Sequence, residues 1–144
     1  MKQTLPVFKS SWQSKLTLPL VWLFTALAMV PSVWSDRVEV EYDTGTHQDT
    51  RLERSLSIHV PVNEPATPFV NKGTFEAKLE SQLIINARQK VTFEMRGQGE
   101  AKLAVNDIET LNSLNKVSEA ITLSEGKHEI RIHFKSPKGK DAAL

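Results

Sequence analysis

The stretch KHEIRIHFK, residues 127–135, decides the fold class. Apolar side chains alternate in it with polar ones: Ile130, Ile132 and Phe134 against Glu129, Arg131 and His133. Because successive side chains of a strand point to opposite faces, this period of two predicts a half-buried β-strand. Gly126 precedes the run and Pro137 follows it, as expected for residues that bound a strand.

The same alternation recurs along the chain before this stretch. Further strands are predicted at 37–42, 52–60, 75–80, 91–96 and 101–106, with shorter ones at 83–85 and 121–123. Three prolines make residues 61–72 a loop, and Asn106-Asp107 has the chemistry of a tight turn. No sustained 3.6-residue period occurs after residue 35. The pattern therefore predicts an all-β, antiparallel β-sandwich.

Composition limits the class of protein. The chain has 144 residues, the size of about one domain. Its content of 40% hydrophobic and 24% charged residues excludes wholesale disorder. A formal net charge of +1 gives no basic field for nucleic acid. The chain has no cysteine, which excludes disulfides, thiolate metal sites and cysteine nucleophiles.

Residues 1–35 have the order of a secretory signal. Lys2, Lys9 and Lys15 precede an apolar run at 16–30, and small residues flank a cleavage zone that ends at Ser35. We predict a hydrophobic helix here that is removed after Ser35, while an uncleaved membrane anchor is the first alternative and a buried core helix the second. Both leading interpretations place residues 36–144 outside the cytoplasm, secreted, periplasmic or anchored facing outward. The membrane is then a partner only through residues 1–35.

Removal of this segment changes the charge and the aromatic content. Without its three lysines the chain keeps 15 basic and 17 acidic residues, a net charge of −2. All three tryptophans lie in residues 1–35. Their loss weakens any prediction of an aromatic platform for sugars or bases.

No catalytic, metal or cofactor site is predicted. His128 and His133 are five residues apart on one strand, so they point to opposite faces and cannot both bind one metal directly. No serine stands in a G-x-S-x-G elbow, and the pair Gly97-x-Gly99 precedes no helix. The sequence therefore indicates a protein that is not an enzyme.

The order of strands and turns over residues 56–144 resembles a PA14-type β-sandwich. Val91-Thr92-Phe93 matches a "YTF"-like strand, Asn106-Asp107 a hairpin turn, and 126–134 a "G-x-H-x-I-x-I-x-Y" strand. The loop at 65–69 is similar to a "P-x-T-P-F" loop in divergent PA14-like modules of exported, haem-containing bacterial proteins. The resemblance implies a binding module.

Two departures from the family pattern affect this implication. Gly97-Gln98-Gly99 stands where the family has an acidic calcium turn, so the calcium-dependent binding of sugars is not carried over. The resemblance implies that the loops with Gln98, Asn106 and Asp107 contact the ligand. The chain ends at 142–144, where the family's final strand begins. We therefore expect a missing last strand and an unpaired slot beside 127–135, which either self-associates or is filled by another chain.

Two functions follow as expectations. The first is an exported, non-catalytic module that binds a polysaccharide or a protein partner outside the cytoplasm. The alternative is a detached or truncated structural N-terminal module of an exported cytochrome-type redox protein. A neighbouring gene that encodes a Cys-x-x-Cys-His protein would favour the alternative.

Overall fold

The structure, a computed structural model, describes residues 33–34 and 37–144. The predicted N-terminal helix lies outside the described residues, as does the cleavage point after Ser35. Every regular element in the described part is a β-strand, which confirms the all-β, antiparallel fold class. None of those residues belongs to a helix long and apolar enough to cross a membrane.

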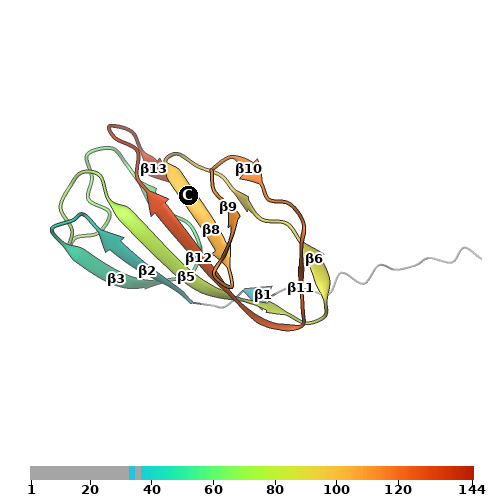
Figure 1. Ribbon diagram of the computed structural model, residues 1–144. Helices are drawn as coiled ribbons and strands as arrows, with labels where there is room; N and C mark the ends of the chain where they lie inside the picture. Colours follow the sequence, from blue (N-terminus) through green and yellow to red (C-terminus); the bar gives the residue numbers. More distant parts are fainter. Residues whose placement is uncertain (1–32, 35–36) are drawn as a thin grey trace, which may run out of the picture.

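One antiparallel sheet of seven strands forms the larger layer (Figure 1). Its order is β3 (Gln48–Glu53), β2 (Val38–Asp43), β5 (Glu76–Ile85), β12 (Gly126–Lys135), β8 (Glu100–Val105) and β9 (Ile108–Leu111). A short strand, β1 (Val33–Trp34), pairs with Leu83 and Ile84 of β5 beyond the end of β2. Both β2 and β1 thus use the same edge of β5.

Three short antiparallel pairs form the second layer. They are β4 (His59–Val60) with β13 (Ala142–Ala143), β7 (Glu94–Met95) with β10 (Lys116–Val117), and β6 (Gln89–Val91) with β11 (Ile121–Leu123). Buried residues of these pairs, such as Val60, Met95 and Leu123, belong to the same core cluster as those of the large sheet. The two layers therefore enclose one core, in a sandwich-like arrangement.

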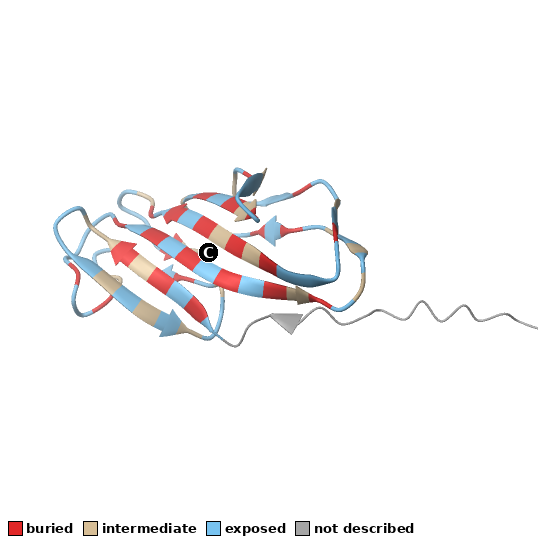
Figure 2. Cartoon of the chain, turned by 60° about the horizontal axis from the view of Figure 1, so that its bottom comes forward, coloured by how far each residue is buried: buried red, intermediate tan, exposed pale blue. Residues whose placement is uncertain are grey.

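The alternation of burial along the long strands explains why they form. Residues of β5, β8 and β12 alternate between buried and exposed, as the red and blue bands of Figure 2 show. Phe134, Ile130 and Leu79 are among the largest side chains that are almost fully buried. Phe75 packs on Phe134 with ring centroids 6.1 Å apart, which joins the sheet to the adjoining loop.

β12 lies at the centre of the large sheet. It pairs with β5 over ten residues, from Gly126 opposite Ile85 to Lys135 opposite Glu76, and with β8 over six. The prediction of an unpaired slot beside 127–135 is therefore wrong, since both edges of this strand are hydrogen-bonded to neighbours. The end of the chain lies in the other layer, where β13 pairs with β4.

Several predicted strand limits also need correction. Residues 76–80 and 83–85 belong to a single strand, β5, because Ser81 continues the buried face between them, while Phe75 lies before the strand. Residues 52–60 are not one strand: β3 ends at Glu53, and the chain bends before β4 starts at His59. Residues 91–96 divide between β6 and β7, and the strands β9, β10 and β13 lie outside every predicted strand.

Candidate functional site

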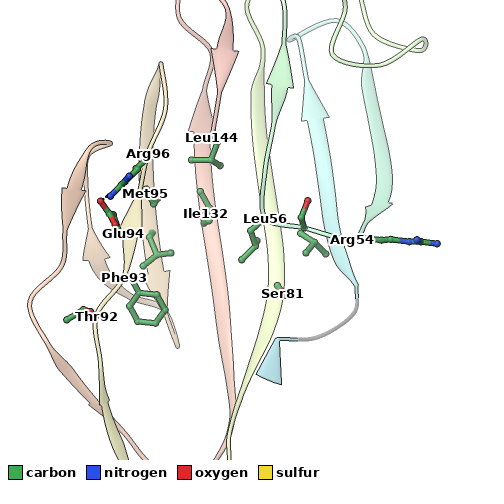
Figure 3. A pocket seen from close by; sticks show the side chains of 13 residues that line it. Arg54, Leu56, Ser81, Thr92, Phe93, Glu94, Met95, Arg96, Ile132 and Leu144 are labelled. Atoms are coloured by element: carbon green, nitrogen blue, oxygen red, sulfur yellow. Dashed lines mark hydrogen bonds and ion pairs between the residues drawn. The ribbon is translucent and has the colours of Figure 1, made fainter. Parts of the chain in front are cut away.

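A groove of about 690 Å³ opens in the second layer. Residues 54–56 form one wall, and residues 92–96 form the other. Ile132 of the central strand β12 lies between the two walls, and Leu144 stands at one end (Figure 3). The groove is thus assembled from residues that lie far apart in the sequence.

The lining of the groove is mainly apolar. Seven apolar residues contribute to it: Val38, Leu56, Phe93, Met95, Leu103, Ile132 and Leu144. Ser81 of β5 also lines it, and the Oγ atom of Ser81 is buried with no hydrogen-bond partner among the described residues. An unsatisfied buried hydroxyl costs about 1–3 kcal/mol, so Ser81 lowers the stability of the fold.

Charged residues stand only at the rim. The Nε of Arg96 donates to Glu94 Oε1 at 2.7 Å, and this hydrogen bond raises the pKa of the Arg96 guanidinium. Arg54 points away from the groove (Figure 3). The rim therefore presents one neutralised ion pair and does not select for a strongly charged ligand.

Asn106, a predicted ligand-loop residue, is engaged inside the protein. Its Oδ1 accepts from the Glu129 backbone N–H at 3.0 Å, and its Nδ2 lies 2.9 Å from Nδ1 of His128. The Nε2 of His128 lies 2.9 Å from the carbonyl of Ser124, so it must donate there and Nδ1 must accept. Asn106 thus ties the β8–β9 turn to β12 and has no amide group turned to a ligand.

Replacement of Asn106 is expected to lower the free energy of unfolding, and by more with alanine than with glycine. The residue has a φ of 51°, a left-handed conformation that glycine adopts without penalty. Asn106→Gly removes only the side-chain hydrogen bonds and should lower the free energy of unfolding by about 1–2 kcal/mol. Asn106→Ala removes the same hydrogen bonds and also places a Cβ in the left-handed conformation, which should cost about 1 kcal/mol more. Urea denaturation of both variants measures this difference. Equal losses would mean that the backbone conformation is not strained.

Gln98 lies far from the other two predicted ligand-loop residues, Asn106 and Asp107, which are neighbours in the β8–β9 turn. Asp107 forms an ion pair with Arg131, which also contacts Glu129 at 2.7 Å. Gln98 lies at the opposite end of β8, whose six residues span about 20 Å. The backbone of Gln98 pairs with Ala143, and its side chain is exposed. The structure therefore places the three predicted ligand-loop residues at two separate ends of the sheet.

Calcium is expected to leave the melting temperature unchanged. The connection at 97–99 holds no carboxylate, and the Asn115 side chain already bonds Gly97 through its backbone N–H at 3.2 Å and its carbonyl at 3.1 Å. A site filled at a hundred times its Kd would add about 2.7 kcal/mol to stability. Thermal melts with calcium and with a chelator measure this, and a clear rise with calcium would contradict the interpretation of this loop.

The histidines lie where the strand period predicts. His128 is buried and His133 is exposed on the other face of β12, while His59 is exposed. Across residues 37–144, no three His, Asp or Glu side chains gather as metal ligands would. The prediction that the chain binds no metal or cofactor stays a prediction.

Sequence reasoning did not find the groove. The period of two places Leu56 and Met95 on the apolar faces of two predicted strands. The only local signal was the run of small polar residues around Leu56, which interrupts a strand pattern at 54–57. That signal marks a bend, and it does not tell which distant segment the bend will face.

Comparisons with known proteins give no family. No protein-family model matches the chain, and no curated protein matches it. Among solved structures, a β-glucosidase from Kluyveromyces marxianus is similar over 74% of this chain, with 14% sequence identity and a TM-score of 0.44. The chain spans only 14% of the length of that enzyme.

Proposed function

We propose that this chain is a non-catalytic binding module with a PA14-like β-sandwich, that it works outside the cytoplasm, and that it binds through the groove. The observation that carries the proposal is the apolar lining of a groove of about 690 Å³. Exposed apolar surface of this kind is costly in water and is typical of interaction sites. The signal-like order of residues 1–35 supports export.

The chemistry of the groove favours a protein segment over a polysaccharide as the ligand. Sugar rings are usually held by the faces of tryptophan or tyrosine together with many polar groups. Phe93 is the single aromatic residue of the lining, and Ser81 supplies one buried hydroxyl. Apolar side chains of a peptide fit such a surface better than sugar hydroxyls do.

Selection from a displayed library of random peptides tests the proposal. We expect peptides that bind the wild-type chain and the Leu52→Arg variant but fail to bind Leu56→Arg. Leu56 forms a groove wall, whereas Leu52 is 65% exposed on the large sheet, outside the groove, and serves as the matched control. Thermal melting checks that both variants fold.

A glycan array, probed with and without calcium, tests the alternative ligand, a polysaccharide. We expect no binding to it under either condition. Enriched glycans together with an absence of groove-dependent peptides would assign the module to a polysaccharide and overturn this choice of ligand.

Export is expected to leave a chain that starts near Asp36. Mass spectrometry of the protein recovered from outside the cytoplasm measures this start. Cleavage after Ser35 also removes β1 and thereby exposes the edge of β5 at Leu83 and Ile84. The product would lack tryptophan, so its emission should be weak and tyrosine-like. A mature chain that retains Trp22 would favour a membrane anchor.

A further inference from the structure

One edge of the large sheet is a regular strand with an open side. β3 is the last strand there, and among the described residues it pairs only with β2 (Figure 1). The pairing runs over six residues without a register shift. The strand contains no proline and no lysine, residues that often protect an edge from a further strand. Its geometry and composition therefore permit the addition of another strand.

The hairpin between β2 and β3 fixes which backbone groups face this edge. The N–H of Thr44 donates to the carbonyl of His47 at 3.1 Å, so these two residues form a hydrogen-bonded pair. Because hydrogen-bonded and non-hydrogen-bonded pairs alternate along an antiparallel ladder, Asp49, Arg51 and Glu53 also bond to β2. The backbone groups that point outward belong to the other three residues of the strand, Gln48, Thr50 and Leu52.

Two opposite charges lie on the core side of this edge. Asp49 is opposite Tyr42 of β2. Arg51 is opposite Val40, and both Tyr42 and Val40 belong to the core. The Nε of Arg51 donates to Asp49 Oδ2 at 2.8 Å. Hydrogen bonds from Thr67 and from Arg51 lower the pKa of Asp49, so its carboxylate is charged at neutral pH.

Each face of the edge also carries an exposed apolar residue. Leu52 is 65% exposed on the outer face, and Phe69 is 70% exposed on the other. The guanidinium carbon of Arg51 lies 5.9 Å from the centre of the Phe69 ring. The turn that holds Phe69 is fixed, since the N–H of Val70 donates to the carbonyl of Thr67 and both residues are buried. Apolar contacts are thus available on both sides of a new seam.

A second copy of the chain fits this edge best in one antiparallel register. Residues exchange hydrogen bonds across the seam only where the outward backbone groups of both copies meet. Placing Thr50 opposite Thr50 of the second copy also brings Gln48 opposite Leu52, twice by symmetry. All three outward residues of each copy are then bonded. Sliding the strands by two residues in either direction loses one of these three pairs.

The charges on the core side select the same register. With Thr50 opposite its counterpart, Asp49 of each copy lies opposite Arg51 of the other. The existing ion pair of each copy and the two new ones then form a closed ring of alternating charges. A slide by two residues sets Arg51 opposite Arg51 in one direction and Asp49 opposite Asp49 in the other. Like charges directly opposite one another destabilise a strand pair.

We propose that the chain forms a twofold symmetric dimer through β3, in which the two large sheets join edge to edge into one antiparallel sheet centred on Thr50. The interface is isologous, because both copies contribute the same residues. The small net charge of the chain sets no strong repulsion against it. The inference goes beyond the proposed function and does not rest on it, since no residue of β3 lines the groove.

The other edge of the large sheet suits a second copy less well. β9 has only four residues, and its pairing with β8 shifts register between Leu103 and Ala104. A bulge of this kind increases the local twist and hinders the addition of a further strand. Glu109 of β9 is already paired with Lys102 at 3.6 Å.

Two charge variants and their mixture test the dimer. Sedimentation velocity of the protein recovered from outside the cytoplasm measures association, and thermal melting checks that each variant folds. Asp49→Arg sets arginine opposite arginine at both ends of the seam, and Arg51→Asp sets carboxylate opposite carboxylate. Glu109→Arg, a charge reversal on the other edge, is the matched control.

We expect the wild type and Glu109→Arg to dimerise alike. Each of the two β3 variants alone should dimerise at least about tenfold more weakly, because like charges then face one another twice. An equimolar mixture of Asp49→Arg and Arg51→Asp should restore the dimer, since every charge at the seam then faces an opposite one. A variant that is merely damaged would not be rescued in this way.

Introduced cysteines locate the register without changing the charges at the seam. The sequence contains no cysteine, so each thiol is an introduced one. Thr50→Cys should crosslink to itself, because the Cα atoms of a hydrogen-bonded pair lie about 5.5 Å apart, within the range of a disulfide. Gln48→Cys and Leu52→Cys should crosslink severalfold more when mixed than when each is alone.

Four results would overturn the inference. A wild-type chain that stays monomeric excludes the dimer. A dimer that both β3 variants retain uses another surface, and this surface is β9 if Glu109→Arg breaks it. A mixture that stays monomeric although both variants fold excludes the ring of charges. Crosslinking of Gln48→Cys or Leu52→Cys alone in preference to their mixture excludes the register centred on Thr50. Peptide binding to the groove is measured separately, so it can fail or succeed independently of each of these results.

Discussion

Replacing Gly97 by alanine is expected to release the end of the chain and to lower the free energy of unfolding by about 3 kcal/mol. Gly97 has a φ of 154°, and an added Cβ would lie 2.0 Å from the carbonyl oxygen of Ala143. That carbonyl accepts the hydrogen bond from Gln98, so the clash falls on the contact that fixes β13. Urea denaturation measures the loss, and hydrogen exchange at Ala143 and Leu144 locates it.

Gly126→Ala is the matched control for this prediction. Gly126 has a φ of 127°, yet an added Cβ there meets nothing within 4 Å. Gly126→Ala should lower the free energy of unfolding by about 1–2 kcal/mol, which is the cost of the backbone conformation without a clash. If both variants lose the same stability and the amides of β13 stay protected, the close approach of Gly97 to the end of the chain is not what holds it.

The second large effect is expected from Phe134→Ala, with a loss of about 3–5 kcal/mol. Phe134 is 2% exposed, its ring packs on Phe75, and it lies against Gly99, where an added Cβ would meet the ring at 2.8 Å. Truncation removes apolar burial and leaves a cavity in the core near the end of β12. Chemical denaturation measures the change.

Ile108→Ala is the control for the removal of apolar atoms as such. Ile108 is 71% exposed, so its truncation should change stability by less than about 0.5 kcal/mol. Comparable losses in the two variants would mean that Phe134 is not part of a tightly packed core.

The sequence predicts best those strands that have one face on the core. β2, β5, β8 and β12 alternate between buried and exposed residues because the large sheet has the second layer on one side only. Alternation reports burial, however, and not pairing. It therefore could not tell that 127–135 has neighbours on both edges, and it merged residues 52–60 across a bend.

The groove was beyond the reach of sequence reasoning for a related reason. Its walls come from segments about 40 residues apart, and Leu144 joins them from the second layer, after the chain has left β12. The residues that turn chemistry singled out, Asn106 and Asp107, use their polar groups in holding the β8–β9 turn to β12. The polar residues at this position thus indicated the tight turn correctly, but they are not evidence for a ligand site.

The central place of β12 has a consequence for the order in which the chain can fold. β3, β2 and β5 form one group of paired strands and β8 and β9 another, and only β12 joins them. β12 comes after the other strands of the large sheet in the sequence, so a growing polypeptide cannot join the two groups until Lys135 has been synthesised. Such long-range closure makes folding slow. A late closing strand keeps a nascent chain loose for longer, the state in which a polypeptide is most easily threaded through a narrow pore.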